Sequence, residues 1–187
     1  MSDGYDASKP IQVASYTIKD FHAKNRWLSV PEIILHSSNI GAAKMAIDLG
    51  GAVQRSYLDK FGMLKPAQLE IPEVGSPLMP SVWRPINTMT ISYGHGISVS
   101  PLQVIAGVSA LVNGGVYRQP TLLKAHGELK TGRQVVTKET SNKIRNLMRL
   151  VVSKGTGRRA NIQGYLIGGK TGTAEKISKN GYSKFSK

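Results

Sequence analysis

The segment that most constrains the fold is PLQVIAGVSALV, residues 101–112. Ser100 and Gln103 have the spacing of a capping box, and Pro101 suits a first turn, so the segment predicts a helix. Apolar residues occur on all of its sides instead of along one stripe. Because such a helix is stable only when other elements cover it, we expect it to be the buried axis of the domain. A chain of 187 residues, 40% of them apolar, is large enough to build that core.

Shorter helices are expected before this segment, within a helix-rich region over 25–115. Ser29 and Glu32 form a second capping box, with Pro31 in the first turn. The letters HSSN follow at 36–39, where Ser and Asn side chains compete for backbone hydrogen bonds and favour a break. Two more helices are expected, one from about Gly41 to the Gly50-Gly51 pair and one over QRSYLDKF up to Gly62.

Irregular and β structure is expected in three other places. Residues 63–96 hold five prolines and predict a long irregular segment, with 93–96 shaping a loop near a cleft. Rough alternation and β-branched residues over KPIQVASYTIKD, residues 9–20, predict a strand or hairpin arm. A small β region is expected over 116–137, where VYRQPTLLKA and RQVVT indicate two short strands.

The clearest amphipathic pattern predicts a helix over 138–153. Thr137 is a favoured N-cap residue. Apolar residues then recur at the helical spacing i, i+3, i+4 and i+7, as Ile144, Leu147, Met148 and Val151. Because basic and polar residues occupy the opposite side, we expect one face of this helix to pack on the rest of the domain.

The charge of the chain suits an anionic environment but not nucleic acid. Lys and Arg number 25 and Asp and Glu 11, so the formal net charge is +14. The basic residues are scattered, and aromatic residues make up only 6%, which argues against a stacking surface for single strands. Acidic cell-surface polymers or an anionic membrane face would attract the same charge. Without cysteine, and with four histidines at no ligand spacing, neither a metal nor a cofactor is expected.

The segment GYLIGGKTGTAEK, residues 164–176, allows two interpretations. From Gly164 to Thr171 it has the letter pattern of a phosphate-binding loop. From Lys170 it reads Lys-Thr-Gly, an element of the serine enzymes that penicillin inhibits. A phosphate loop needs a buried strand before it and a helix at its Lys-Thr, yet Gly164 follows polar residues and Gly172 suits a first turn poorly. Nucleotide binding therefore stays a remote alternative, and we expect 164–176 to be a strand.

The Lys-Thr-Gly interpretation predicts a partner motif, which Ser37-Ser38-Asn39 supplies as Ser-x-Asn. Three blocks, HSSNIGAAKMA, ISYGHGISVSPLQVIAGVSALVNGGVYRQP and GTGRRANIQGYLIGGKTGTAEK, resemble in the same order the transpeptidase domain of class B penicillin-binding proteins. Within that group they look most like the division-type enzymes of Gram-negative bacteria. The resemblance covers nearly the whole chain. It implies an α+β fold of the penicillin-binding, serine β-lactamase-like type, here incomplete: the helical part plus the Lys-Thr-Gly strand.

The resemblance implies acyl transfer in cell-wall synthesis and division. A peptidoglycan D,D-transpeptidase acylates a serine with the D-Ala-D-Ala end of a stem peptide and passes the acyl group to an amine. Carried over to this chain, Ser37 helps to move protons, and Asn39 contacts the substrate amide. Lys170 places positive charge beside Ser37, which eases deprotonation of a hydroxyl and attracts a carboxylate.

The Lys-Thr-Gly strand is expected to bind the substrate. Thr171 and Thr173 offer hydroxyl donors to its carboxylate, and hydrogen bonds to a charged group contribute roughly 1.5–3 kcal/mol each. Gly172 leaves room for a peptide to add as an extra strand. The resemblance also implies that the N–H of Thr173 forms half of an oxyanion hole. The implied partners are stem peptides, β-lactam antibiotics and cell-division membrane proteins, at the periplasmic face of the bacterial inner membrane.

One element of the family's pattern is not in the sequence. No serine is followed by Lys three positions on, whereas the family uses Ser-x-x-Lys, which one helical turn places on one face. In the family that motif lies upstream, and further strands and a helix follow Lys-Thr-Gly. We therefore expect 1–187 to be a partial domain, truncated at both ends, with its membrane anchor upstream and no activity as given. The open alternative is a non-catalytic relative that binds peptidoglycan or division partners without acylation.

Overall fold

The computed structural model describes residues 3–124, 131–172, 176–178 and 181–183. The helices are α1 (Val30–His36), α2 (Asn39–Leu49), α3 (Gly51–Lys60), α4 (Pro85–Ile91), α5 (Pro101–Val112) and α6 (Lys138–Lys154), with a short 3₁₀ turn, η1, at Arg158–Ala160. The strands are β1 (Gly4–Asp6), β2 (Ile11–Val13), β3 (Tyr16–Ile18), β4 (Trp27–Ser29), β5 (Val116–Tyr117), β6 (Arg133–Gln134), β7 (Lys176–Ser178) and β8 (Gly181–Ser183).

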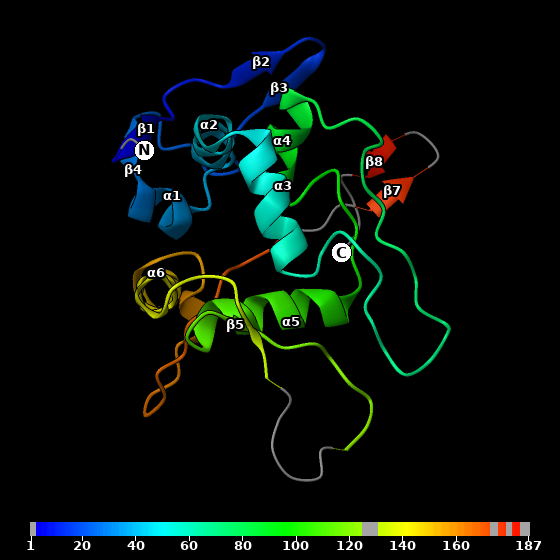
Figure 1. The fold of residues 1–187 in the computed structure, drawn as a ribbon. Coiled ribbons are helices and arrows are strands. Elements are labelled where there is room, and N and C mark those ends of the chain that lie inside the picture. The colour runs from blue at the N-terminus through cyan, green and yellow to red at the C-terminus, as the bar shows by residue number, and fades with distance from the viewer. Residues whose placement is uncertain (1–2, 125–130, 173–175, 179–180, 184–187) are drawn as a thin grey trace.

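In the part of the chain that the structure describes, the four strand pairs are antiparallel and two-stranded: β1 with β4, β2 with β3, β5 with β6 and β7 with β8. Figure 1 shows the helices in two groups. In one, α2 packs against α3 and α4; in the other, α5 and α6 pack together. Helix α1 contacts both α2 and α6, so it joins the groups. The α+β class predicted from the sequence is confirmed.

Helix α1 begins at the capping box that the sequence predicts. The hydroxyl of Ser29 accepts from the Glu32 backbone N–H, and the Glu32 carboxylate accepts from the Ser29 N–H at 3.0 Å. Arg26 adds a 2.7 Å ion pair to the same carboxylate. The hydrogen bond from Arg26, followed by those from Ser29, lowers the pKa of Glu32 to about 2. A charged carboxylate therefore stabilises the first turn of α1, where the helix dipole also favours it.

The core behind this corner is small and apolar. Ala7, Leu28, Ile33 and Ile40 form one buried cluster that joins β1 and β4 to the first two helices. Gly41 lies so close to Ile33 that an added Cβ would meet its side chain at 2.5 Å. The α1–α2 corner is therefore packed tightly against the two strands, which fixes the loop between the helices.

Two predicted helices are confirmed with their caps, and one begins earlier than expected. Ser100 and Gln103 form the capping box of α5, and the Thr137 hydroxyl accepts from Thr140 N–H at the start of α6. Helix α2 starts at Asn39 instead of Gly41, because Ser38 is its N-cap. The predicted hairpin over 9–20 and the two short strands within 116–137 are also present, as β2–β3 and β5–β6.

The prediction of an irregular segment over 63–96 is wrong in part, since α4 lies within it. Pro85 stands at the start of that helix, where a missing N–H costs nothing and its fixed φ suits the turn. The Asn87 side chain accepts from the Arg84 backbone N–H at 2.9 Å. The prediction fails here because Pro85 starts a helix, and a proline breaks a helix only in its interior.

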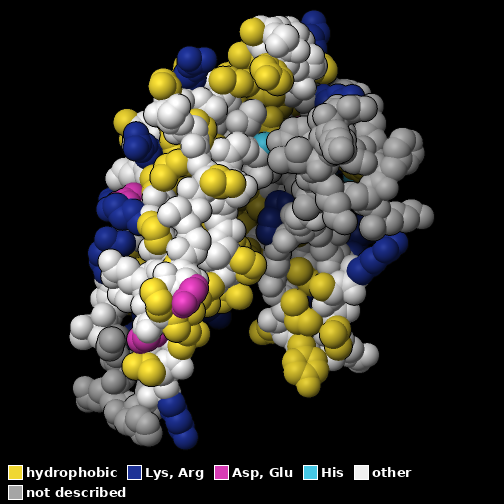
Figure 2. Space-filling view, turned by 90° about the vertical axis from the view of Figure 1, so that its right-hand side faces the viewer, with side chains coloured by type: hydrophobic (Ala, Val, Ile, Leu, Met, Phe, Trp, Pro, Cys, Tyr) yellow, Lys and Arg dark blue, Asp and Glu magenta, His cyan; other side chains and the backbone are white. Residues whose placement is uncertain are grey.

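The prediction that the helix over 101–112 is buried on all sides is wrong for the residues that the structure describes. Its buried face holds Gln103, Ala106 and Ala110, and it contacts α6 and β5. On the other side Ile105 is 62% exposed and Val104 41%. Figure 2 shows hydrophobic side chains exposed in several patches on one face of the molecule. No described β-sheet covers this side of α5, so these apolar side chains stay exposed to solvent.

The strand expected over 164–176 is also not formed between residues 164 and 172. Among the described residues no other strand pairs with this stretch, and a strand without a hydrogen-bonded neighbour is not stable as sheet. Strand β7 begins only at Lys176 and pairs with β8. Residues 173–175, with Thr173, lie outside the described part of the chain. The sequence also predicts that 1–187 is a partial domain made of a helix-rich part, a small β region, a helix and a strand. That domain description stays a prediction.

Within the described ranges, every helix is too short or too polar to cross a lipid bilayer.

Candidate functional site

The first wall of the candidate site, the serine wall, is formed by Ser37 and Ser38 between α1 and α2 and by Asn39, the first residue of α2. Ser37 ends α1 in the left-handed region, with φ 55° and ψ 50°. Its N–H donates to the Ile34 carbonyl at 3.3 Å, and the next N–H donates to Ile33 at 3.0 Å. Ser38 then caps α2, its hydroxyl accepting from Gly41 N–H at 3.0 Å. The helix break predicted at HSSN is confirmed.

The second wall is the segment Lys170-Thr171-Gly172, the lysine wall, which follows a stretch held on α6. The Gly169 N–H donates to the Met148 carbonyl at 3.1 Å. The Arg149 guanidinium donates to the Ile167 carbonyl at 3.0 Å and to the Asn161 side chain at 2.9 Å. These contacts hold the stretch that leads to Lys170 against α6.

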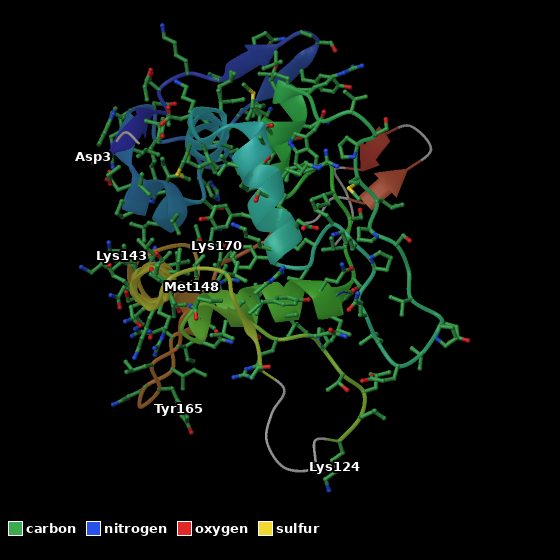
Figure 3. All side chains as sticks on the ribbon, in the orientation of Figure 1. Asp3, Lys124, Lys143, Met148, Tyr165 and Lys170 are labelled. Atoms are coloured by element: carbon green, nitrogen blue, oxygen red, sulfur yellow. The ribbon has the colours of Figure 1, made fainter. Side chains whose placement is uncertain are left out.

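The two walls meet through one side-chain hydrogen bond. Lys170 Nζ donates to Ser37 Oγ at 2.7 Å, although 133 positions separate the two residues. It also donates to the Thr171 carbonyl at 2.8 Å. Figure 3 places Lys170 between α1 and α6. Gly155, at the end of α6, makes this approach possible, because a Cβ there would meet Leu35 at 2.7 Å.

Burial lowers the pKa of Lys170 below its ordinary value of 10.5. Among the ion pairs found within the described ranges, none involves its ammonium group. The partial loss of water therefore favours the neutral amine over the charged form. A lysine that holds a serine hydroxyl and releases its proton more easily than a solvated lysine is equipped for proton transfer.

A cavity of about 570 Å³ opens between the walls. All three residues of the Ser-x-Asn motif line it, together with Lys170, Thr171 and Gly172. A Cβ added at Gly172 would meet no atom within 4 Å, so space is open beside that backbone. The Thr171 hydroxyl shares a 2.7 Å hydrogen bond with that of Thr156. The structure thus brings together five of the six predicted site residues (Ser37, Asn39, Lys170, Thr171 and Gly172), and Thr173 lies outside the described residues.

The site includes one loop that the sequence predicts near a cleft, and it is contacted by two residues that the sequence did not predict. Tyr93 and His95 line the cavity as well, which agrees with the loop expected near a cleft at 93–96, and burial raises the pKa of Tyr93. Thr156 and Asp20 were missed. The signal for Asp20 was weak: a single acidic residue that follows a short hairpin. Its contact to the serine wall spans 18 positions, and no sequence spacing reveals it.

No group of three or more His, Cys, Asp or Glu side chains in the described ranges is arranged to hold a metal ion. The side chains that line the cavity offer hydroxyls, an amine, an amide and imidazoles. Comparison with known proteins agrees with that chemistry. The family described as "Penicillin binding protein transpeptidase domain" matches residues 2–187. The chain belongs to this family.

Curated relatives carry names of the same kind. "Probable peptidoglycan D,D-transpeptidase FtsI" of Caulobacter vibrioides is 38% identical over 176 residues, which cover 92% of this chain and 30% of that protein. "Stage V sporulation protein D" of Bacillus subtilis is 34% identical over 164 residues, covering 81% of this chain and 25% of that protein. The chain therefore spans less than a third of the length of each of these relatives.

Solved structures of the family have the same arrangement of elements. The transpeptidase domain of penicillin-binding protein 3 from Burkholderia pseudomallei matches with a TM-score of 0.84 at 30% identity, over 93% of this chain and 54% of that one. Penicillin-binding protein 3 from Mycobacterium tuberculosis, solved with aztreonam, matches with a TM-score of 0.83 at 25% identity, over 94% of this chain and 44% of that one. This chain therefore corresponds to about half of a transpeptidase-domain structure.

Proposed function

We propose that this chain forms part of the active site of a peptidoglycan D,D-transpeptidase that is also a target of β-lactam antibiotics. The observation that carries the proposal is the 2.7 Å hydrogen bond from Lys170 to Ser37 inside a cavity, in a member of the penicillin-binding transpeptidase family. The substrates are stem peptides of peptidoglycan. The place of action is the periplasmic face of the inner membrane, in contact with division proteins.

In the proposed reaction a serine oxygen attacks the carbonyl carbon between the two D-Ala residues. The C–N bond to the terminal D-Ala breaks, and the serine proton ends on the leaving amine. An acceptor amine then attacks the acyl-serine ester: a new amide C–N bond forms, the C–O bond to the serine breaks, and the serine oxygen takes back a proton from the attacking amine. Ser37 and Lys170 form the proton path, because their side chains are already hydrogen-bonded and burial lowers the pKa of the amine.

The lysine wall recognises the end of the substrate. A terminal carboxylate would accept from the Thr171 hydroxyl, which now bonds only to another hydroxyl in the described structure, and would lie near the Lys170 charge. The open space at Gly172 suits an extended peptide. Asn39 lines the same cavity, which supports a contact between its side chain and a peptide group of the substrate. The role of Thr173 in the oxyanion hole remains part of the proposal. The nucleophile belongs to a Ser-x-x-Lys pair, which is not among these 187 residues.

The test is a double-mutant cycle in the protein expressed at the full length of its gene. Ser37→Ala and Lys170→Ala should each slow acylation by a fluorescent penicillin by about 10²–10³, the loss typical of one electrostatic or proton-transfer group. The double variant should lose about as much as either single variant, since the two residues act as a unit. Lys154→Ala, an exposed lysine on α6 outside the cavity, is the matched control and should acylate at the parent rate.

The outcomes separate the two functions that the sequence leaves open. A folded parent protein that binds peptidoglycan but forms no acyl-enzyme would support the non-catalytic relative instead. Fully additive losses in the cycle would contradict a shared proton path between the two residues.

A further inference from the structure

Asp20 binds the serine wall from outside the cavity. Its carboxylate accepts from the Ser38 hydroxyl at 2.8 Å through one oxygen. Its other oxygen accepts from the Ile40 backbone N–H at 2.9 Å. Both donors belong to the N-terminal turn of α2, where an anion is favoured. The carboxylate therefore caps α2 together with Ser38, although it comes from a distant part of the chain.

The residue before Asp20 holds the third member of the motif. The Asn39 side-chain amide donates to the Lys19 carbonyl at 3.0 Å. Ile18, which directly precedes Lys19, is the last residue of β3 and is only 4% exposed. The pair 19–20 is thus fixed to the fold through a buried neighbour, and it contacts both residues that follow Ser37.

We call the hydrogen bonds from Ser38 and Ile40 to Asp20, and from Asn39 to the Lys19 carbonyl, the clamp. The clamp matters for Ser37 because the backbone of that residue has an unfavourable conformation. A non-glycine residue at φ 55° is held only where the surroundings impose it. On the N-terminal side α1 imposes it; on the C-terminal side the hydrogen bonds of Asp20 hold the start of α2. Without Asp20, the α2 side loses two of its restraints, and Ser37 can relax away from Lys170.

We propose that Asp20 is a positioning residue that fixes the Ser37 hydroxyl at Lys170, acting through its hydrogen bonds to Ser38 and Ile40 at the start of α2. The inference rests on the proposed function for its catalytic consequence. Its structural part, the clamp itself, stands apart from whether the protein is acylated.

The experiment compares Asp20→Ala with Asp20→Asn in the full-length protein. The Ala variant should lower the acylation rate constant for a fluorescent penicillin roughly 10- to 100-fold, since a misplacement of about 1 Å costs about 100-fold. Its non-covalent binding constant should stay within about threefold, because Asp20 does not line the cavity. Asn can accept from Ile40 and donate to Ser38, so it should restore most of the rate.

The matched control is Asp48→Asn, since Asp48 also lies on α2 and accepts a hydrogen bond, from the Tyr5 hydroxyl at 2.7 Å, away from the cavity. It should leave acylation unchanged. A merely structural role for Asp20 predicts loss of thermal stability and activity in parallel, with no split between rate and binding constants. That result would overturn the inference, as would an Ala variant with the parent rate.

A second readout separates this inference from the proposed function. Hydrogen exchange at the amides of Ile40 and Gly41 should be at least about tenfold faster in Asp20→Ala than in the parent, with the amides of α6 unchanged. If the parent is never acylated but this exchange accelerates, the function fails and the clamp stands. If exchange is unchanged, the clamp is wrong whatever the activity.

Discussion

The two walls of the cavity are built in different ways. The serine wall lies between two helices that are neighbours in the chain, and its bonds come largely from nearby caps and turns. The lysine wall has no regular structure in its described residues and is held through α6, mainly by Arg149 and by the Gly169 N–H. The serine wall is thus held mostly by contacts between residues close in the sequence, whereas the lysine wall depends on contacts of its preceding stretch with α6.

The difference shows in exposure. Near the serine wall, Ser38 is 4% exposed and Ile40 2%. In the stretch leading to the lysine wall, Tyr165 is 70% exposed and Leu166 94%. Segments with few buried contacts open at low free energy, so we expect the lysine wall to be the first part of the site to loosen. The Ser37–Lys170 hydrogen bond of the proposed proton path therefore depends on how well the lysine wall is ordered.

The largest expected effect tests whether the serine wall and the lysine wall alone can form an acyl-enzyme. The purified 187-residue chain, incubated with excess labelled penicillin, should form no covalent adduct, because neither wall supplies a serine paired with a lysine one helical turn away. Intact-mass spectrometry is the measurement. A stoichiometric mass increase of one penicillin, mapped to any serine of this chain, would show that the nucleophile has been misplaced.

A second change weakens only the lysine wall. Arg149→Ala removes the bonds to Ile167 and Asn161, so acylation of the full-length protein should fall about tenfold, equivalent to ~1.4 kcal/mol. Hydrogen exchange should rise at 167–169 and stay constant in α1. Arg145→Ala, on the exposed side of the same helix, is the control and should be silent. Equal loosening of both walls would contradict the distinction drawn between them.

The smallest effect is a pH dependence of the serine wall. Glu32 has its pKa lowered from 4.5 to about 2, mainly by Arg26. Its contribution to stability is therefore fully present above pH 4.5 and is lost as the pH falls through about 2. Glu32→Gln should melt below the parent at neutral pH, and the difference in Tm should shrink across that window.

Glu139→Gln is the control for this pH series, because Glu139 also has a lowered pKa, from its pair with Lys143, but lies on α6. Hydrogen exchange in α1 should respond to acid in the parent and less in Glu32→Gln. A constant Tm difference between parent and Glu32→Gln from pH 4.5 to about 2 would rule out the assigned role of this carboxylate.

Local signals predicted the helices well where a cap and a pattern agreed. The boxes at Ser29 and Ser100 and the cap at Thr137 each start a helix in the structure. Predictions failed where the outcome depended on partners far away in the chain. The apolar pattern of α5 could not say which of its sides would be covered, and the glycine-rich stretch 164–172 could not say whether another strand would pair with it.

The sequence by itself determined the family and the residue types of the site, because motif order and spacing are properties of the chain alone. It also determined the break at Ser37, since competing side chains and two helix caps act over a few residues. Only the tertiary structure decided that Lys170 reaches Ser37 across 133 positions and that Asp20 caps α2. Such contacts depend on how helices pack, and packing is set by the shapes of surfaces that are not adjacent in the sequence.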